Sequence, residues 1–491
     1  MDHRSANSPF DFEHQPAAPA LAELGPRRDR RTAAARRRRR VLTVHGAPLA
    51  LAGLAVSTMG AAQTTAGGST FSGNADETVA DLQTYWAKTM PEVYGQKYES
   101  IPSDRLFPYS AQNPPPGCGT RGTTPYQEVA GNAFYCSEGD FVAWDTQELF
   151  PKLTKQFGAF APALVLAHEW GHAIQARVGF DAYQTVYLEQ QADCFAGAWS
   201  AHVASGDAGL SMSADDLDRA LAGMLQLSDP IGIDSSQDGA HGNGFDRVSA
   251  FQDGFEGGAK ACADYENDPP SLTESGFTSQ ADYATGGNMS LDKLVPAITD
   301  ALGTYWKQAV STKVNAPKLV AASTSGNASS ASCDGNTDGG VLVDTVVYCP
   351  SNNTIIYDPA TLQQANSSVG DFAAALLIAA EYSSAVQHGA GVKVDSSSAR
   401  RTSECMAGAF AGSLDGSRQS TRSDSITLSP GDLDEVISML VSSTSGDGRG
   451  TAFERVAAFR SGYVKGIDAC VSSSSSSGSN GSSSKSGSTR I

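Results

Sequence analysis

The chain has 491 residues, of which 40% are hydrophobic and 18% charged, a composition typical of a globular protein with room for about two or three domains. Its formal net charge is −18, but residues 1–62 contain ten Arg and five acidic residues and carry +5, which leaves −23 for the rest. An acidic body argues against nucleic acid as a partner.

The N-terminal residues combine a basic run with an apolar segment. Arg36–Arg40 precede residues 41–62, which are uncharged apart from one histidine and end in small residues. This order is typical of an export signal, so we expect residues 1–40 to form a disordered basic segment and residues 41–62 the hydrophobic region of a signal peptide. Arg38-Arg39 could serve as a twin-arginine signal, and the apolar segment is also about long enough to remain as an uncleaved membrane anchor. We predict an exported protein, extracellular or at the cell envelope, rather than a cytosolic protein with a basic tail.

Predicted helices and hairpins follow in chain order. Apolar residues recur at helical spacing over residues 76–90, and residues 135–144 alternate around a Ser-Glu-Gly-Asp turn that is typical of a β-hairpin. Ser213 is a predicted N-cap, because two aspartates follow it in the first turn of a helix. The patterns together predict a mainly helical α+β fold with small hairpins. Further helices are predicted over residues 161–178, 187–204, 213–226 and 245–257, and a second hairpin over residues 346–357.

One predicted helix carries the motif H-E-W-G-H at residues 168–172. Residues four apart share one face of a helix, so His168 and His172 can both reach one metal ion. Glu169 can then reach a water on that metal and act as the general base of a hydrolase. Glu189 could supply a third ligand from the next helix, which leaves the open fourth position of a catalytic zinc site.

Two other polar residues could belong to such a site. Asp193 lies on the same helical face as Glu189, where it could accept a hydrogen bond from a ligating histidine or be a surface carboxylate. His241 lies in a glycine-rich loop, where it could stabilise the oxyanion of a tetrahedral intermediate or cap the next helix. Geometry must decide between these roles.

Short segments of the chain recur later in the same order. Residues 216–218 (DLD) return as 432–434 (DLD), and residues 245–248 (FDRV) return as 453–456 (FERV). This collinear order predicts a tandem duplication. The stretch between the two copies is rich in Pro, Gly, Ser and Thr, so we expect it to be a linker. The C-terminus consists mostly of Ser and Gly, so we expect it to be a disordered tail. We place the first unit at residues 72–268, the linker at 269–287, the second unit at 288–472 and the tail at 473–491.

The second unit lacks the proposed metal ligands. Ala380, Ser384 and Arg400 stand at the positions of the two histidines and the glutamate. Glu381 alone remains, as the counterpart of the proposed general base. We therefore predict an inactive, metal-free domain. Its role is either structural, as a packing partner of the first unit, or the binding of a substrate or partner in the vestigial cleft.

The eight cysteines divide evenly between the two units. An even number in an exported chain suggests disulfides, and the absence of any C-x-x-C pair argues against a cysteine zinc site. The cysteines of the two units correspond in order, so the same pairing is expected in both, although sequence alone does not prove the connectivity. The expected pairs are Cys118–Cys136, Cys194–Cys262, Cys333–Cys349 and Cys405–Cys470.

The residues around the motif resemble one known family. H-E-x-G-H-x-x-Q at residues 168–175, E-x-Q-A-D-C-F-A-G-x-W at 189–199 and the H-G pair at 241–242 are similar to the "putative neutral zinc metallopeptidases" of bacteria. The resemblance covers most of the first unit. It implies a zincin-like fold, zinc as cofactor and Glu189 as a third ligand of the gluzincin type. It also implies hydrolysis of peptide bonds, with Glu169 taking a proton from a zinc-activated water.

Two other functions stay open at this point. The protein could be a non-catalytic binding protein of the cell envelope, with zinc in a structural or vestigial role. It could also be a zinc amidase that acts on cell-wall peptides. For the peptidase we expect a peptide or protein as substrate and no nucleic acid as partner.

Overall fold

A computed structural model describes residues 71–475, except for 120–121, 183, 208, 238, 274–275, 278, 311–314, 323–332, 334–345, 395, 417–425 and 443–449. The predicted basic segment (1–40), the predicted export signal (41–62) and residues 476–491 of the predicted tail lie outside the described residues, whereas residues 473–475 of that tail belong to the last helix and are not disordered. Within the described ranges, none of the helices combines the length and the apolar character needed to cross a bilayer.

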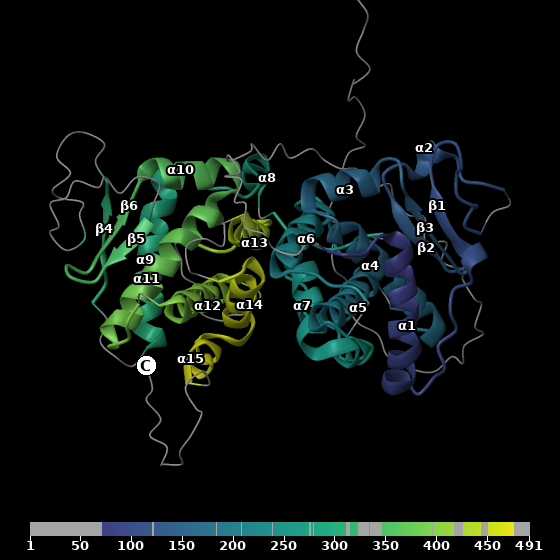
Figure 1. The fold of residues 1–491 in the computed structure, drawn as a ribbon. Coiled ribbons are helices and arrows are strands. Elements are labelled where there is room, and N and C mark those ends of the chain that lie inside the picture. The colour runs from purple at the N-terminus through teal and green to yellow at the C-terminus, as the bar shows by residue number, and fades with distance from the viewer. Residues whose placement is uncertain are drawn as a thin grey trace, which may run out of the picture. The chain divides into compact units, whose positions relative to one another are not determined.

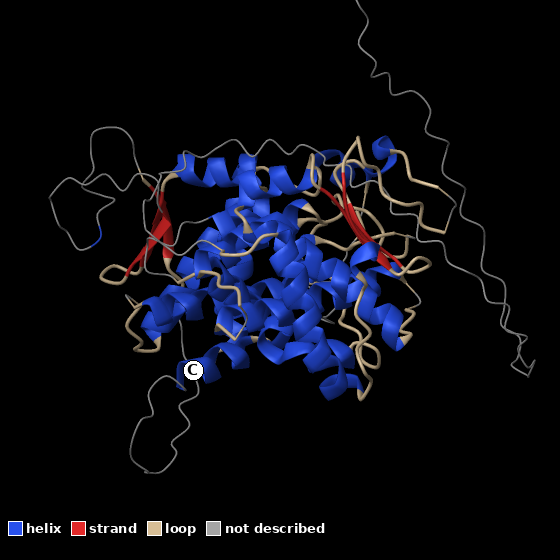
Figure 2. Ribbon diagram, turned by 45° about the vertical axis from the view of Figure 1, so that its right-hand side comes forward, coloured by secondary structure: helices blue, strands red, loops and turns tan. Residues whose placement is uncertain are grey.

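Helices dominate the first half of the described chain, residues 71–268, and one small sheet lies beside them (Figures 1 and 2). Helix α4 contacts α1, α3, α5, α6 and strand β2, so it forms the centre of this half. The elements are α1 (Ala75–Tyr94), η1 (Ser103–Arg105), β1 (Leu106–Tyr109), α2 (Tyr126–Val129), β2 (Ala133–Cys136), β3 (Phe141–Asp145), α3 (Leu149–Phe157), α4 (Phe160–Val178), α5 (Thr185–Ser205), α6 (Ala214–Gln226) and α7 (Gly244–Asp264).

The second half, residues 288–475, repeats this order of elements. Its sheet has the order β4-β6-β5, which matches β1-β3-β2 of the first half, with one parallel and one antiparallel pair in each. The elements are α9 (Leu291–Ala309), β4 (Lys318–Ala321), β5 (Val346–Cys349), β6 (Thr354–Tyr357), α10 (Pro359–Ser368), α11 (Asp371–Gly389), α12 (Ser397–Leu414), α13 (Asp432–Ser442), α14 (Ala452–Lys465) and α15 (Ile467–Ser475).

Several sequence-based expectations are confirmed and others need adjustment. The predicted helices and both hairpins are present, and Ser213 caps α6 as expected. The parallel strands β1 and β4 were not expected, because parallel pairing joins distant segments and leaves no local pattern. Helix α7 continues past residue 257 through a kink at Gly258. The stretch 269–287 contains the short helix α8 (Gln280–Thr285), which Ser279 caps.

Aspartates from each half cap a helix of the other half. Asp218 on α6 accepts hydrogen bonds from the backbone N–H groups of Ala452 and Phe453 at the start of α14, at 2.8 and 2.9 Å. Asp434 on α13 likewise accepts from the first two N–H groups of α7, Gly244 at 3.0 Å and Phe245 at 2.7 Å. The two contacts are reciprocal and lie at corresponding positions of the sequence.

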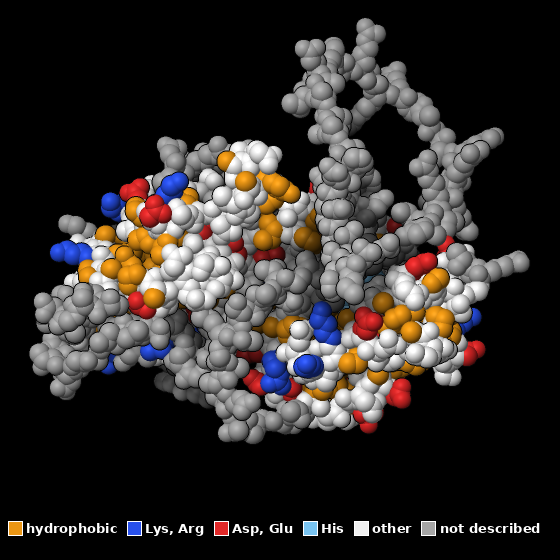
Figure 3. All heavy atoms as spheres, turned by 90° about the horizontal axis from the view of Figure 1, so that it is seen from above, with side chains coloured by type: hydrophobic (Ala, Val, Ile, Leu, Met, Phe, Trp, Pro, Cys, Tyr) orange, Lys and Arg blue, Asp and Glu red, His pale blue; other side chains and the backbone are white. Residues whose placement is uncertain are grey.

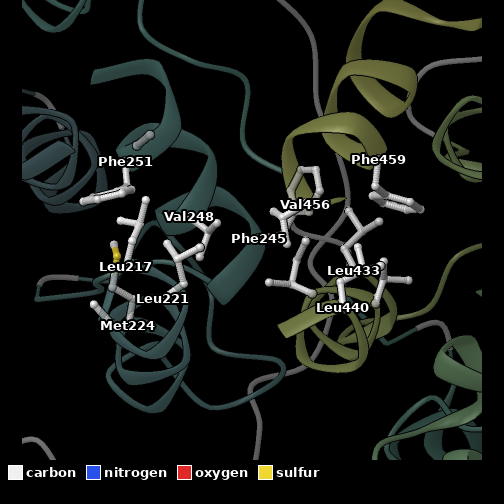
Figure 4. Packing of buried hydrophobic residues seen from close by; sticks show 14 of the residues in the cluster. Leu217, Leu221, Met224, Phe245, Val248, Phe251, Leu433, Leu440, Val456 and Phe459 are labelled. Carbon is white, nitrogen blue, oxygen red and sulfur yellow. The ribbon is translucent and has the colours of Figure 1, made fainter. Parts of the chain in front are cut away.

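Apolar side chains fill the space around these caps. Figure 4 shows Phe245 pointing from α7 toward the α13 and α14 side, where its ring meets that of Tyr463 edge-on with 5.1 Å between centroids. Phe453 of α14 meets the ring of Phe251 of α7 edge-on and packs at a tilt against that of Phe255. One continuous hydrophobic core therefore includes residues of both halves.

Four disulfides join the cysteines in the expected pairs, and every pair lies within one half. The bridge between Cys194 and Cys262 ties α5 to α7, and that between Cys405 and Cys470 ties α12 to α15. The other two, Cys118–Cys136 and Cys333–Cys349, each fix a strand of the small sheet to a loop. Four disulfides suggest an exported protein in an oxidising environment.

Candidate metal centre

The close approach of α4 and α5 builds a cluster of potential metal ligands. Gly171 makes this approach feasible, because a Cβ there would lie 2.7 Å from the Cα of Ala192. His168 and His172 project from α4 toward Glu189 on α5, and one ligand atom of each lies within 4.8 Å of the others. The Nε2 atom of His168 lies 3.2 Å from Glu189 Oε2, and that of His172 lies 3.4 Å from Glu189 Oε1. This geometry could hold one metal ion.

The other ring nitrogens of both histidines have acceptors. His168 Nδ1 lies 2.8 Å from Asp193 Oδ1, and His172 Nδ1 lies 2.9 Å from Gln175 Oε1. Such partners select the tautomer in which Nε2 carries a lone pair for a metal. Asp193 is thus a buried partner of a histidine and not a surface carboxylate, with 1% of its surface exposed.

Asp193 is held in place by a buried arginine. Arg247 on α7 donates to both of its carboxylate oxygens, at 2.8 and 2.9 Å, and to the carbonyl of Leu227 at 2.6 Å. Burial alone would raise the pKa of Asp193, but Arg247 and His168 outweigh it and lower that pKa. Asp193 therefore stays charged and can orient the imidazole of His168.

Electrostatics of the cluster favour a positive charge between the side chains. Burial disfavours the charged imidazole of His168, but Asp193 and Glu189 outweigh burial and raise its pKa to about 10. The pKa of Glu189 is held well below its usual range, because His172 and His241 overcome the effect of burial. Oε2 of Glu189 is buried, and it faces His168 Nε2 at 3.2 Å without a well-formed hydrogen bond. Two imidazole nitrogens and this carboxylate oxygen fit the donor set of zinc.

Glu169 points from α4 to the edge strand of the small sheet. Its Oε2 accepts a hydrogen bond from the backbone N–H of Tyr135 on β2, at 2.8 Å. Burial raises its pKa above the ordinary value for glutamate. A buried carboxylate with a raised pKa, beside two histidines, is suited to take up and release a proton.

The loop that contains His241 is anchored by an aspartate. Asp229 accepts from the backbone N–H groups of His241 and Gly242, at 2.7 and 2.8 Å, and lies 3.4 Å from His241 Nδ1. The next helix, α7, is capped by Asn243 and not by His241, so the capping role is wrong. His241 is near enough to Glu189 to influence its pKa, although it is not one of the three clustered ligands.

The corresponding place in the second half has polar contacts of a different kind. The hydroxyl groups of Ser384 and Ser403 lie 2.8 Å apart. Glu381 accepts from the backbone N–H of Tyr348 at 2.8 Å, which parallels the contact of Glu169 with β2. A buried ion pair between Arg455 and Glu404, at 2.6 Å, stands where the first half has Arg247 and Asp193.

Four contacts of the site were not assigned from the sequence. Gln175 was noticed only as part of the family pattern and Arg247 as part of a repeated segment, and their partners could not be read from spacing. The Tyr135 contact uses a backbone N–H group, which has no residue signature. Asp229 lies 12 residues before His241 in an irregular segment. The one sequence signal for this contact was the presence of an acidic residue shortly before the H-G pair.

Comparison with known proteins gives a consistent result for the first half. Residues 50–265 match the model of the family described as "Putative neutral zinc metallopeptidase". The uncharacterized protein YpfJ of Escherichia coli K12 is 28% identical over 216 residues, which cover 38% of this chain and 71% of YpfJ. The uncharacterized protein Rv2575 of Mycobacterium tuberculosis H37Rv is 30% identical over 152 residues, 26% of this chain and 52% of Rv2575. No solved structure matches the chain. The family description points to zinc as the metal and to a hydrolase. Residues 50–265 are therefore similar to this family of "putative neutral zinc metallopeptidases".

Proposed function

We propose that the first half is an exported zinc-dependent peptidase, with His168, His172 and Glu189 as the zinc ligands and Glu169 as the general base. The observation that carries this proposal is the convergence of both Nε2 atoms on a buried carboxylate whose Oε2 has no other partner. Zinc bound there would lower the pKa of its water to about 7 and polarise the scissile carbonyl.

The residues of the chain would handle the proton and the substrate. Glu169 would take a proton from the attacking water and pass it to the leaving amine, while the Tyr135 N–H keeps its carboxylate in place. Strand β2 lies at the edge of the sheet order β1-β3-β2, so it could pair with an extended peptide beside Glu169. His241 would donate to the developing oxyanion, and Asp229 would fix its loop.

The second half would serve as an inactive packing partner. It retains the buried arginine–acid pair and the strand contact of its glutamate, but Ala380, Ser384 and Arg400 offer no ligand set for zinc. Its reciprocal caps and shared core with the first half support a structural role.

Matched substitutions in the two halves test the proposal. Glu169→Gln should leave zinc content unchanged and lower peptide cleavage by about 10²-fold or more, because general-base catalysis contributes roughly 10²–10⁴-fold. Glu381→Gln, at the corresponding position of the second half, should leave cleavage unchanged. Activity is measured on casein and on mixed quenched peptides, and zinc by elemental analysis. Full activity of Glu169→Gln, or a zinc-loaded chain that cleaves no peptide, would overturn the proposal.

A further inference from the structure

Three carboxylates meet in the second half, away from the proposed zinc centre. Asp371 is the first residue of α11, and Asp432 and Glu435 lie in the first turn of α13. One carboxylate oxygen of each lies within 4.8 Å of the others. Their exposed fractions are 5%, 4% and 4%, so all three are buried.

The backbone satisfies only part of this cluster. Ser429 donates its N–H to Asp432 at 2.8 Å, Phe372 donates to Glu435 at 2.8 Å, and Met289 donates to Asp371 Oδ2 at 2.7 Å. The second oxygen of Asp371, Oδ1, is buried without a hydrogen-bond partner. Polar atoms in such a place are normally paired, so the orphaned oxygen calls for a ligand.

The cluster also lacks a cationic side chain as a partner. Within the described part of the chain, none of Asp371, Asp432 and Glu435 forms an ion pair. Burial and the neighbouring Asp371 together raise the pKa of Glu435 to about 8. Burial, Asp371 and Glu435 act together on Asp432 and raise its pKa well above the ordinary range. Buried charges are normally paired or coordinate a metal.

The first half shows how the same place is neutralised there. Asp216 corresponds to Asp432 and also accepts an N–H from its own N-cap, Ser213, at 2.9 Å. Arg219, three residues further on, donates to Asp216 at 2.6 Å. The residue that corresponds to Arg219 is Glu435, so the second half has an acid where the first half has a guanidinium.

A second replacement goes in the same direction. Counting back from the aligned central helices α4 and α11, Asp371 corresponds to Ala159, which immediately precedes α4. Around the aspartate that both halves share at this position, the first half therefore has a guanidinium and a methyl group, whereas the second half has two carboxylates. This difference leaves the buried carboxylates to be neutralised by bound protons or by a cation from solution, and a cation could take the place of the guanidinium.

We propose that Asp371, Asp432 and Glu435 bind a hard divalent cation, calcium in preference, in the place that the Arg219 guanidinium occupies in the first half. The donors are all oxygens, which favours calcium, magnesium or manganese over zinc. The ion would join the start of α11 to the start of α13, and water or carbonyl oxygens would complete its coordination. This site is separate from the proposed peptidase centre and does not depend on it.

Thermal unfolding of the full, oxidised chain tests the proposal with calcium chloride as the probe. Sites of exported proteins bind calcium with dissociation constants of roughly 10⁻⁴–10⁻³ M, so 10 mM calcium should raise the melting temperature by about 2–3 °C over the EDTA-treated chain. His172→Ala, which removes a proposed zinc ligand, should keep this response.

Variants at the cluster provide the decisive comparison. Glu435→Arg restores the aspartate–arginine pair of the first half, so the calcium response should disappear while the melting temperature in EDTA rises. Asp371→Asn keeps the shape of the side chain and should weaken calcium binding at least tenfold in calorimetric titration; it also serves if Glu435→Arg does not fold. No response of the parent chain to calcium or magnesium at 10 mM, or an undiminished response in Asp371→Asn, would overturn the proposal.

Discussion

Removal of the reciprocal caps should weaken the whole described fold and not one helix alone. Asp218→Ala leaves the N–H groups of Ala452 and Phe453 without their carboxylate, and Asp434→Ala does the same at Gly244 and Phe245. Loss of a capping side chain costs about 0.5–2 kcal/mol. The carboxylate is charged and lies at the positive end of the helix dipole, so we expect the upper part of this range. Each single substitution should lower the free energy of unfolding by about 2 kcal/mol.

Urea denaturation, followed by circular dichroism, measures these losses. The double variant Asp218→Ala/Asp434→Ala should lose at least the sum of the single losses, about 4 kcal/mol, because each cap holds a different helix. Asp218→Asn keeps one acceptor oxygen and should lose less than Asp218→Ala. Glu256→Ala, at an exposed position of α7, is the control and should change stability by less than about 0.5 kcal/mol. Single losses as small as that of the control would refute the capping argument.

Three further outcomes are expected around the proposed zinc centre. Glu189→Ala should abolish stoichiometric zinc binding, measured by elemental analysis after dialysis, and retention of one zinc per chain would exclude Glu189 as a ligand. Arg247→Ala leaves Asp193 buried and unpaired, so it should lower stability by about 3–5 kcal/mol in denaturant titration, whereas a loss below about 1 kcal/mol would contradict that pairing. Reduction of the Cys194–Cys262 bridge opens a covalently closed loop of 68 residues and should lower the free energy of unfolding by about 4 kcal/mol. An unchanged urea midpoint in dithiothreitol would contradict this prediction.

The sequence allowed the helical scaffold of the site to be predicted, because its signals are local. The i, i+4 spacing of His168 and His172 requires only a helix, and the structure provides one. Contacts between segments that are distant along the chain left weaker signals in the sequence. Strand β1 contains Pro108, which argues against a strand, and its parallel partner β3 begins more than 30 residues later.

The role of the repeated DLD segments was equally hidden. Their recurrence identified Asp218 and Asp434 as equivalent positions. A carboxylate at a helix position that the sequence predicts to be exposed, however, gives no indication of a distant partner. The partners are backbone N–H groups about 190 to 235 residues away along the chain. Likewise, the acids of α13 read as ordinary residues of a first helical turn, and only the folded chain places Asp371 beside them.

The distribution of the disulfides has a consequence for how the chain acquires them. Eight cysteines can pair in roughly 100 ways, whereas two independent sets of four can pair in roughly ten. All four bridges stay within one half, so oxidation of the first half can finish without any cysteine of the second. A chain that folds from its N-terminus would thus form two small sets of bridges in succession and would avoid most of the wrongly bridged isomers.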